Sequence, residues 1–174
     1  MKMGIIGTHF TGKTELAEEL YTFLKQHGKD VVLIKETARR CPLPLNKDAT
    51  FEAQTWVLAE QIKQEIESTK HEITISDRSV IDNYAYSLWK FPDKARTMLN
   101  FIIEYSKTYD HIFKTTPLDV PIEPDGYRST DPVFRNEIEK IISDFLHEHS
   151  IQHKLLPEEN TLKHIKEVLG YEND

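Results

Sequence analysis

The sequence has 174 residues, of which 39% are hydrophobic and 29% charged, and its formal net charge is −7. These values predict one soluble globular domain and exclude two large ones. The acidic excess disfavours a broad surface for duplex nucleic acid, although a local basic groove can lie within an acidic average. A single cysteine, Cys41, excludes an internal disulfide. No run approaches the ~20 apolar residues of a membrane span, and the N-terminus lacks a signal-peptide core, so we expect a cytoplasmic protein without membrane contact.

Short β-like runs of apolar residues alternate with longer helical stretches along the chain, and this alternation predicts an α/β sheet. Most of the short runs are rich in valine or isoleucine, which favour strands. The five predicted strands are Met3–Ile6, Val31–Ile34, Glu72–Ser76, His111–Lys114 and Ile151–Leu156.

Helical spacing of apolar residues predicts the segments between these strands. The first helix contains Leu16 to Leu24 and stops at Gly28. Asp131 followed by Pro132 is typical of an N-cap with proline at the first helical position. The second helix is predicted after Asp48, with Phe51, Leu58, Ile62 and Ile66 on its inner face. The other predicted helices cover Ser79 to Trp89, Asp93 to Ser106, and a short stretch after Asn160.

Two proline-containing segments, 39–45 and 115–130, interrupt this alternation. Loops of this length in a compact domain are usually functional or mobile. We predict that the second one, together with the start of the helix that follows, forms a short lid over about residues 115–135.

The segment after the first predicted strand matches the phosphate-binding motif G-x-x-x-x-G-K-S/T at every fixed position. Its glycines let backbone N–H groups turn inward on phosphate oxygens, and the next helix adds the positive end of its dipole. We expect Lys13 to bridge the β- and γ-phosphates of ATP and the Thr14 hydroxyl to ligate Mg²⁺. The predicted nucleotide-binding residues are Gly7, Thr8, His9, Phe10, Thr11, Gly12, Lys13 and Thr14.

The residues after the third predicted strand distinguish transfer from hydrolysis. Motor ATPases usually follow the strand-end aspartate with a glutamate that polarises water, whereas here Arg78 follows Asp77. Guanine-specific GTPases need an Asn-Lys-x-Asp element, and the similar run at 46–49 has Ala49 in place of the aspartate. The sequence therefore favours transfer of the γ-phosphate to a bound acceptor.

Asp77 is placed to hold Mg²⁺ directly or through water, and it is equally suited to cap the next helix. We expect Arg78 to contact phosphate or the acceptor. The next turns of helix carry Asp82, Asn83, Tyr84 and Tyr86. Their polar ends suit a sugar or heterocycle, and the alternative is a place on the helix surface or in the core.

The run Asp77-Arg78-Ser79-x-x-Asp82-Asn83-x-Ala85-Tyr86 resembles the D/E-R-S/Y segment of deoxynucleoside and thymidylate kinases. The P-loop, Glu36-Thr37-Ala38-Arg39, this run and Asp125-Gly126-x-Arg128 with Arg135 are together similar to NadR-type nicotinamide riboside kinases and related small P-loop kinases of the AAA type. The resemblance covers about residues 1–156.

This resemblance implies roles for four residues outside the P-loop. Glu36 would lie by the acceptor hydroxyl, and Arg39 would bind the acceptor or phosphate. Arg128 and Arg135 would belong to a lid over the γ-phosphate.

The order of the predicted elements supports these roles on physical grounds. In a parallel α/β sheet, ligands gather at the carboxyl ends of the strands, and Gly7, Glu36 and Asp77 each follow such an end. Glu36 can then accept or orient the proton of an acceptor hydroxyl. Arg39 and Arg40 are adjacent, so at most one of them is expected to face the site.

A separate physical argument supports the roles of the two lid arginines. Arg128 and Arg135 flank the predicted helix start at Asp131. A guanidinium carried by a closing segment stabilises charge more strongly as water leaves.

We therefore predict a single P-loop kinase domain over residues 1–174, with a three-layer α/β P-loop fold. Its parallel sheet has five strands in the order 2-3-1-4-5, helices on both faces and the short lid. The predicted activity uses ATP and Mg²⁺ to phosphorylate a small nucleoside-like acceptor, either nicotinamide riboside or a (deoxy)nucleoside. Two alternatives stay open: a kinase for a nucleotide or nucleic-acid end, and an ATPase or nucleotide-dependent switch.

Overall fold

The computed structural model describes residues 1–45, 48–117 and 131–171. Its five strands form one parallel sheet in the order β2-β3-β1-β4-β5, which confirms the predicted topology. The strands are β1 Lys2–Ile6, β2 Val31–Ile34, β3 Ile73–Asp77, β4 His111–Lys114 and β5 Lys154–Leu155. The helices are α1 Lys13–Gln26, α2 Phe51–Glu67, α3 Val80–Lys90, α4 Pro92–Arg96, α5 Leu99–Ser106, α6 Pro132–Glu148 and α7 Thr161–Val168. The 3-10 helices that lie wholly within the described residues include η1 Thr37–Arg40 and η3 Ser68–Lys70.

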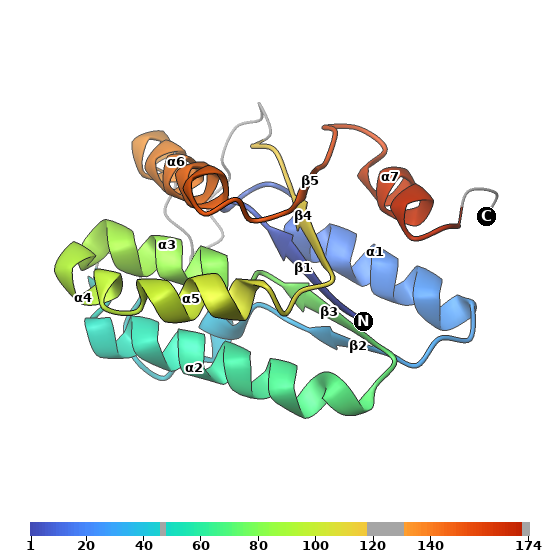
Figure 1. Cartoon of the computed structure of the whole chain (residues 1–174), viewed down its shortest axis with the longest axis horizontal. Helices are drawn as coiled ribbons and strands as arrows, with labels where there is room; N and C mark the ends of the chain where they lie inside the picture. The colour runs from blue at the N-terminus through green and yellow to red at the C-terminus, as the bar shows by residue number, and fades with distance from the viewer. Residues whose placement is uncertain (46–47, 118–130, 172–174) are drawn as a thin grey trace.

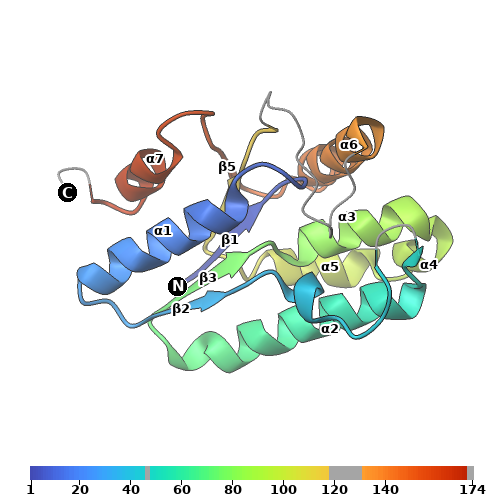
Figure 2. The ribbon, with the colours of Figure 1, turned by 180° about the vertical axis from the view of Figure 1, so that it is seen from behind.

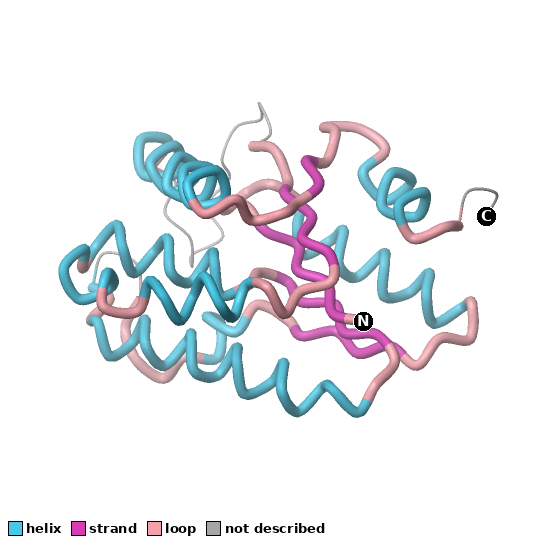
Figure 3. Tube along the Cα trace, viewed as in Figure 1, coloured by secondary structure: helices cyan, strands magenta, loops and turns pink. Residues whose placement is uncertain are grey.

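Helices cover both faces of the sheet (Figure 1), and Figure 3 shows the strands running through the middle of the molecule between them. On one face, α1 and α7 pack over an apolar cluster that includes Met3, Ile5 and Phe113. On the other face, α2, α3, α5 and α6 pack over a cluster that includes Ile6 and Ile112. Apolar faces buried in this way confirm the three-layer P-loop fold. None of the described helices is long and apolar enough to cross a membrane.

Side chains cap the starts of α2, α3 and α6. The Thr50 side chain accepts from the backbone N–H of Ala53 at 3.2 Å at the start of α2. At the start of α6, Asp131 Oδ1 accepts from the N–H of Val133 at 2.9 Å, and Pro132 occupies the first turn, as predicted.

Three predicted details were wrong. The fifth strand is limited to Lys154–Leu155, because only these two residues pair with β4. The stretch predicted as one helix from Asp93 to Ser106 is divided into α4 and α5. Ile66, predicted on the inner face of α2, is 59% exposed, and the polar side chains of Gln61 and Glu65 are buried there instead.

All five strands are parallel, so their carboxyl ends lie at one edge of the sheet. Figure 2 shows the arrowheads of β1, β2 and β3 pointing toward this edge. β1 leads into the P-loop, β2 leads to Glu36 and η1, and β3 ends at Asp77. The chain thus brings three predicted parts of the site to the same edge.

Candidate active site

The P-loop requires glycine at two of its positions. Gly7 and Gly12 have φ angles of 141° and 73°, a region that favours glycine over residues with a Cβ. A Cβ on Gly7 would also overlap the Thr115 hydroxyl. That hydroxyl hydrogen-bonds with Thr11 Oγ1 at 2.7 Å, which fixes the loop against the segment after β4.

Lys13 turns back into the loop that precedes it. The side chain is buried, and Nζ donates to the carbonyl oxygen of Thr8 and, at 2.9 Å, to Thr11 Oγ1. The ammonium group therefore lies where a P-loop holds phosphate oxygens, next to the positive end of the α1 dipole.

Asp82 holds the P-loop to the start of α3. Its Oδ1 accepts from the N–H of Gly7 at 2.9 Å, and its Oδ2 accepts from the N–H of Ser79 at 2.8 Å in a capping box. Burial raises the pKa of Asp82, and the positive charges of Arg78 and Lys13 oppose this rise. Asp82 is fully buried and lies outside the described lining of the pocket beside the P-loop, and its predicted acceptor contact stays a prediction.

Thr14 and Asp77 place two oxygen atoms next to each other. Thr14 Oγ1 donates a hydrogen bond of 2.8 Å to Asp77 Oδ2. Mg²⁺ prefers oxygen ligands and commonly takes only one or two from the protein, with water and phosphate oxygens as the others. The pair fits such a shared site, whereas the described residues contain no group of three His, Cys, Asp or Glu side chains suited to hold a metal by themselves.

A pocket beside the P-loop is lined by residues from the P-loop, η1, α2, α3 and α6, together with Glu36, Leu45 and Arg78. Glu36 is the buried carboxylate of this pocket. Its Oε1 accepts from Arg78 Nε at 2.9 Å, and its Oε2 accepts from Arg39 Nε at 3.0 Å. Arg40 instead donates to Glu60 at 3.0 Å on the exposed side of α2, so Arg39 is the arginine of the pair that faces the site.

The backbone of Arg78 aims its side chain at Glu36. Arg78 has a φ angle of 79°, an uncommon conformation for a non-glycine residue, and its N–H donates to the carbonyl oxygen of Ile5 at 3.0 Å. Burial lowers the pKa of this guanidinium, but Glu36 and the neighbouring Tyr86 outweigh that effect, and the pKa lies well above its usual value. Arg78 is therefore a permanent buried cation whose charge is matched by Glu36.

Aromatic rings form one wall of the pocket. Tyr86 OH lies 3.1 Å from His9 Nδ1, and the Tyr86 ring centroid is 5.9 Å from that of Phe134. Trp89 packs edge-to-face on Phe134 with the centroids 4.6 Å apart. Burial raises the pKa of Tyr86, so its hydroxyl stays protonated. These rings offer edges and faces that suit a planar ligand.

Asn83 adds a polar group to the same pocket. The residue is 5% exposed and lines the pocket, and its Nδ2 has no hydrogen-bond partner among the described residues. Buried polar groups are almost always paired in folded proteins, so this amide is suited to bond with a ligand.

Tyr84 does not line this pocket in the described part of the chain. It is 2% exposed and packs against Phe145 of α6, with the ring centroids 5.5 Å apart. Tyr84 and Tyr86 are two positions apart on α3, which turns them to different sides of the helix. Of the two tyrosines, Tyr86 lines the pocket, and the substrate contact of Tyr84 stays a prediction.

The predicted lid is described only at its ends, and Arg128 lies outside the described residues. Arg135 lies in the first turn of α6, and its carbonyl oxygen accepts from Thr8 Oγ1 at 3.1 Å. The start of α6 therefore contacts the P-loop directly.

Several pocket residues were not among the predicted site residues. Gln54 and Val57 come from α2, Lys90 ends α3, and Phe134 begins α6. For Phe134 the signal was present, because its apolar side chain lies four positions before Ile138 on the inner face of α6. Nothing in the local pattern distinguishes a pocket-lining residue from a core residue in that position.

A family model described as an AAA domain matches residues 2–162. The chain belongs to this family. Comparison of this AAA domain with curated proteins found no match.

Solved structures with the same fold include two of deoxyadenosine kinase from M. mycoides. The structure with dCMP and dCDP bound has a TM-score of 0.63 at 18% identity. The alignment covers 97% of the present chain and 96% of the kinase chain. The structure with dATP bound has a TM-score of 0.64 at 15% identity, with coverage of 97% and 98%.

The NadR protein also has a similar fold. Its complex with NR has a TM-score of 0.73 at 18% identity. The alignment covers 91% of the present chain and 46% of the NadR chain. The chain thus spans about half the length of NadR. At such identities these similarities show the fold.

Proposed function

We propose that this AAA domain is a kinase that transfers the γ-phosphate of ATP to a small nucleoside-like acceptor. One observation carries the proposal: His9 of the P-loop lines the same pocket as the buried carboxylate of Glu36. A triphosphate on the P-loop and a molecule in the pocket would therefore lie next to each other. Phosphoryl transfer depends on such placement of donor and acceptor.

Glu36 is the group that faces the acceptor hydroxyl in this proposal. Its carboxylate is fixed by one hydrogen bond from each of two arginines, Arg78 and Arg39. In a loose phosphoryl-transfer transition state, a fixed oxygen that orients the hydroxyl matters more than a strong base. A guanidinium has five N–H donors in a planar fork, a geometry that suits acceptor or phosphate oxygens.

The triphosphate side is assigned to other residues. Lys13 would pair with the β- and γ-phosphates, and Thr14 and Asp77 would hold Mg²⁺. Bound there, the ion would offset the charge that develops on the phosphate oxygens. Arg128 and Arg135 are proposed to stabilise the transferring group from the lid side.

The class of acceptor follows from the shape and chemistry of the pocket. The edge-to-face wall of Tyr86, Trp89 and Phe134 suits a planar ring, and the Asn83 amide suits a polar atom on it. The similar solved structures carry a deoxynucleotide or NR as their named ligands. Nicotinamide riboside and the (deoxy)nucleosides are therefore the first acceptors to test.

The test is a screen with ATP labelled in the γ-phosphate and one acceptor at a time. We expect label on nicotinamide riboside or on a nucleoside. Label that moves only to a nucleoside monophosphate or to an oligonucleotide end would favour the first alternative, and transfer to an oligonucleotide should weaken steeply with salt. Slow phosphate release that no acceptor changes would identify an ATPase or a nucleotide-dependent switch.

A further inference from the structure

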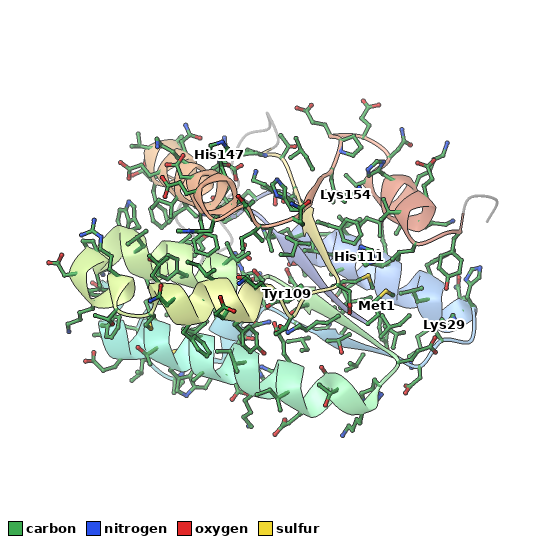
Figure 4. All side chains as sticks on the ribbon, viewed as in Figure 1. Met1, Lys29, Tyr109, His111, His147 and Lys154 are labelled. Atoms are coloured by element: carbon green, nitrogen blue, oxygen red, sulfur yellow. The ribbon has the colours of Figure 1, made fainter. Side chains whose placement is uncertain are left out.

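A second polar cluster lies behind the pocket, between α2 and the sheet. Its side chains are at most 8% exposed. They come from η1, α2, β3 and the turn before β4, and Tyr109, labelled in Figure 4, lies near the centre of the molecule. The members of this buried cluster are Thr37, Gln61, Glu65, Ser76 and Tyr109.

Gln61 stands at the centre of the buried cluster. Its Oε1 accepts from Thr37 Oγ1 at 2.8 Å, and its Nε2 donates to Glu65 Oε1 at 2.8 Å and to Ser76 Oγ. The amide thus connects the first residue of η1 with the end of β3. Each of these two contacts lies one residue away from a predicted site residue, because Thr37 follows Glu36 and Ser76 precedes Asp77.

The far end of the cluster is firmly held. Glu65 Oε1 also accepts from Tyr109 OH at 2.7 Å and from Ser76 Oγ at 3.2 Å, while Oε2 accepts from Lys2 Nζ at 3.0 Å. A carboxylate with this many donors fixes the orientation of the Gln61 amide, since only the Nε2 end can face it. The Oε1 end is then left to receive the Thr37 hydroxyl.

We infer that Gln61 is a positioning residue that sets the place of Glu36 relative to Asp77. The chain of contacts runs from Glu65 through the Gln61 amide to Thr37, whose backbone continues directly from Glu36. A buried network whose members are all paired gives a rigid support, and the same amide ties that support to β3 through Ser76. The inference rests on the proposed function, because Gln61 would fix the distance between Glu36, which faces the acceptor, and Asp77, which would hold Mg²⁺.

The role requires both ends of an amide. A carboxylate at position 61 would face Glu65 with like charge, and an apolar side chain would leave the Thr37 and Ser76 hydroxyls and Glu65 with fewer partners. Such changes at Gln61 also threaten folding. A substitution of Thr37, whose hydroxyl bonds with the Gln61 amide, tests the link with less risk to the fold.

The test compares Thr37→Val, which removes the hydroxyl and keeps the branched shape, with Thr37→Ser, which keeps the hydroxyl. Thr74→Val is the matched control, because the buried Thr74 hydroxyl donates to Ser68 Oγ at 2.8 Å and not to the Gln61 amide. The measurements are kcat, KM for ATP, and amide hydrogen exchange of residues 36–40.

Thr37→Val should speed exchange at residues 36–40 and lower kcat by about tenfold with KM for ATP unchanged, because displaced catalytic groups lose rate before they lose donor binding. Thr37→Ser and Thr74→Val should match the wild type. Unchanged exchange in Thr37→Val would overturn the inference, and so would faster exchange with wild-type kcat or an equal loss of kcat in Thr74→Val.

The same measurements separate this inference from the proposed function. If the wild type phosphorylates no acceptor, the proposed function fails, and hydrogen exchange alone then decides whether the Gln61 amide holds the Glu36 loop. Faster exchange confined to Thr37→Val would support that structural link, and equal exchange in all variants would refute it.

Discussion

Thr14 and Asp77, 63 positions apart in the sequence, meet through a hydrogen bond of 2.8 Å from the hydroxyl to the carboxylate. They meet because β1 and β3 are neighbours in the sheet, with Ile5 opposite Asp77. Glu36 reaches the same edge from β2, the next strand beyond β3. The parallel sheet thus places the proposed metal ligands and the proposed acceptor carboxylate on adjacent strand ends.

Asp77→Asn should raise the Mg²⁺ concentration needed for half-maximal turnover by at least about tenfold, because a neutral amide is a weaker ligand for a hard cation. A Mg²⁺ titration at saturating ATP measures the shift. Asp144→Asn, on α6 and paired with Lys140, serves as the control and should leave the titration unchanged. The same Mg²⁺ dependence in Asp77→Asn and wild type would remove Asp77 from the metal site.

Lys13→Ala should abolish turnover, because the ammonium group lies inside the P-loop with the carbonyl oxygen of Thr8 and Thr11 Oγ1 as neighbours. Loss of one preorganised charge of this kind typically costs at least about 10² in rate. Lys25→Ala, near the exposed end of the same helix, should keep wild-type kinetics. Measurable turnover close to that of Lys25→Ala would contradict the assigned role.

The sequence was sufficient to predict features whose signal is local. The P-loop and the strand ends that carry Glu36 and Asp77 follow from short motifs and the alternation of strands with helices. The order of the sheet is not a local signal and was predicted with the P-loop kinase fold that the motifs resemble. The single P-loop kinase domain and the lid stay predictions.

Contacts between distant segments could not be predicted in the same way. Asp82 was predicted to contact the acceptor because its polar end suits a sugar or heterocycle, and no feature of the sequence indicated that its carboxylate bonds with the N–H of Gly7, 75 positions away. Tyr84 was predicted to contact the acceptor for the same reason. Which side of α3 faces the core depends on where α6 packs, and Tyr84 packs against Phe145 of α6. Ile66 was expected on the inner face of α2, whereas Glu65 is the residue buried there. The partner of Glu65 is Lys2, which lies 63 positions away in the sequence.

Glu36→Gln should lower kcat by at least about tenfold and leave ATP affinity nearly unchanged, because the proposed contact of Glu36 is with the acceptor and not with the triphosphate. Steady-state kinetics and direct ATP binding separate the two effects. The variant also removes the carboxylate charge that pairs with the buried Arg78, so its unfolding midpoint should be measured beside the kinetics. Wild-type turnover in a folded Glu36→Gln protein would refute the assignment.

Arg128→Ala and Arg135→Ala should each slow phosphoryl transfer while sparing binding of ATP in the ground state, because lid arginines act on charge that develops during transfer. Single-turnover rates and ATP binding measure the two quantities. Equal loss of both would make the arginine a binding residue and not a lid catalyst.

Asp82→Asn should lower the free energy of unfolding by about 1–2 kcal/mol, because an amide cannot accept at both ends and one of two buried N–H groups loses its partner. Urea unfolding measures the change. Asp93→Asn is the control, since that side chain is 98% exposed and pairs with the exposed Arg96. Equal stability of the two variants would show that the contact of Asp82 with Gly7 and Ser79 contributes little.

The most direct measurement follows the γ-phosphate of labelled ATP in a single turnover, with and without the acceptor that the screen identifies. If the protein is a kinase with its acceptor pocket beside the P-loop, label should appear on the acceptor faster than as inorganic phosphate. Glu36→Gln should remove this difference in rate. Release of all the label as inorganic phosphate, at one rate whether or not an acceptor is present, would contradict the proposed transfer.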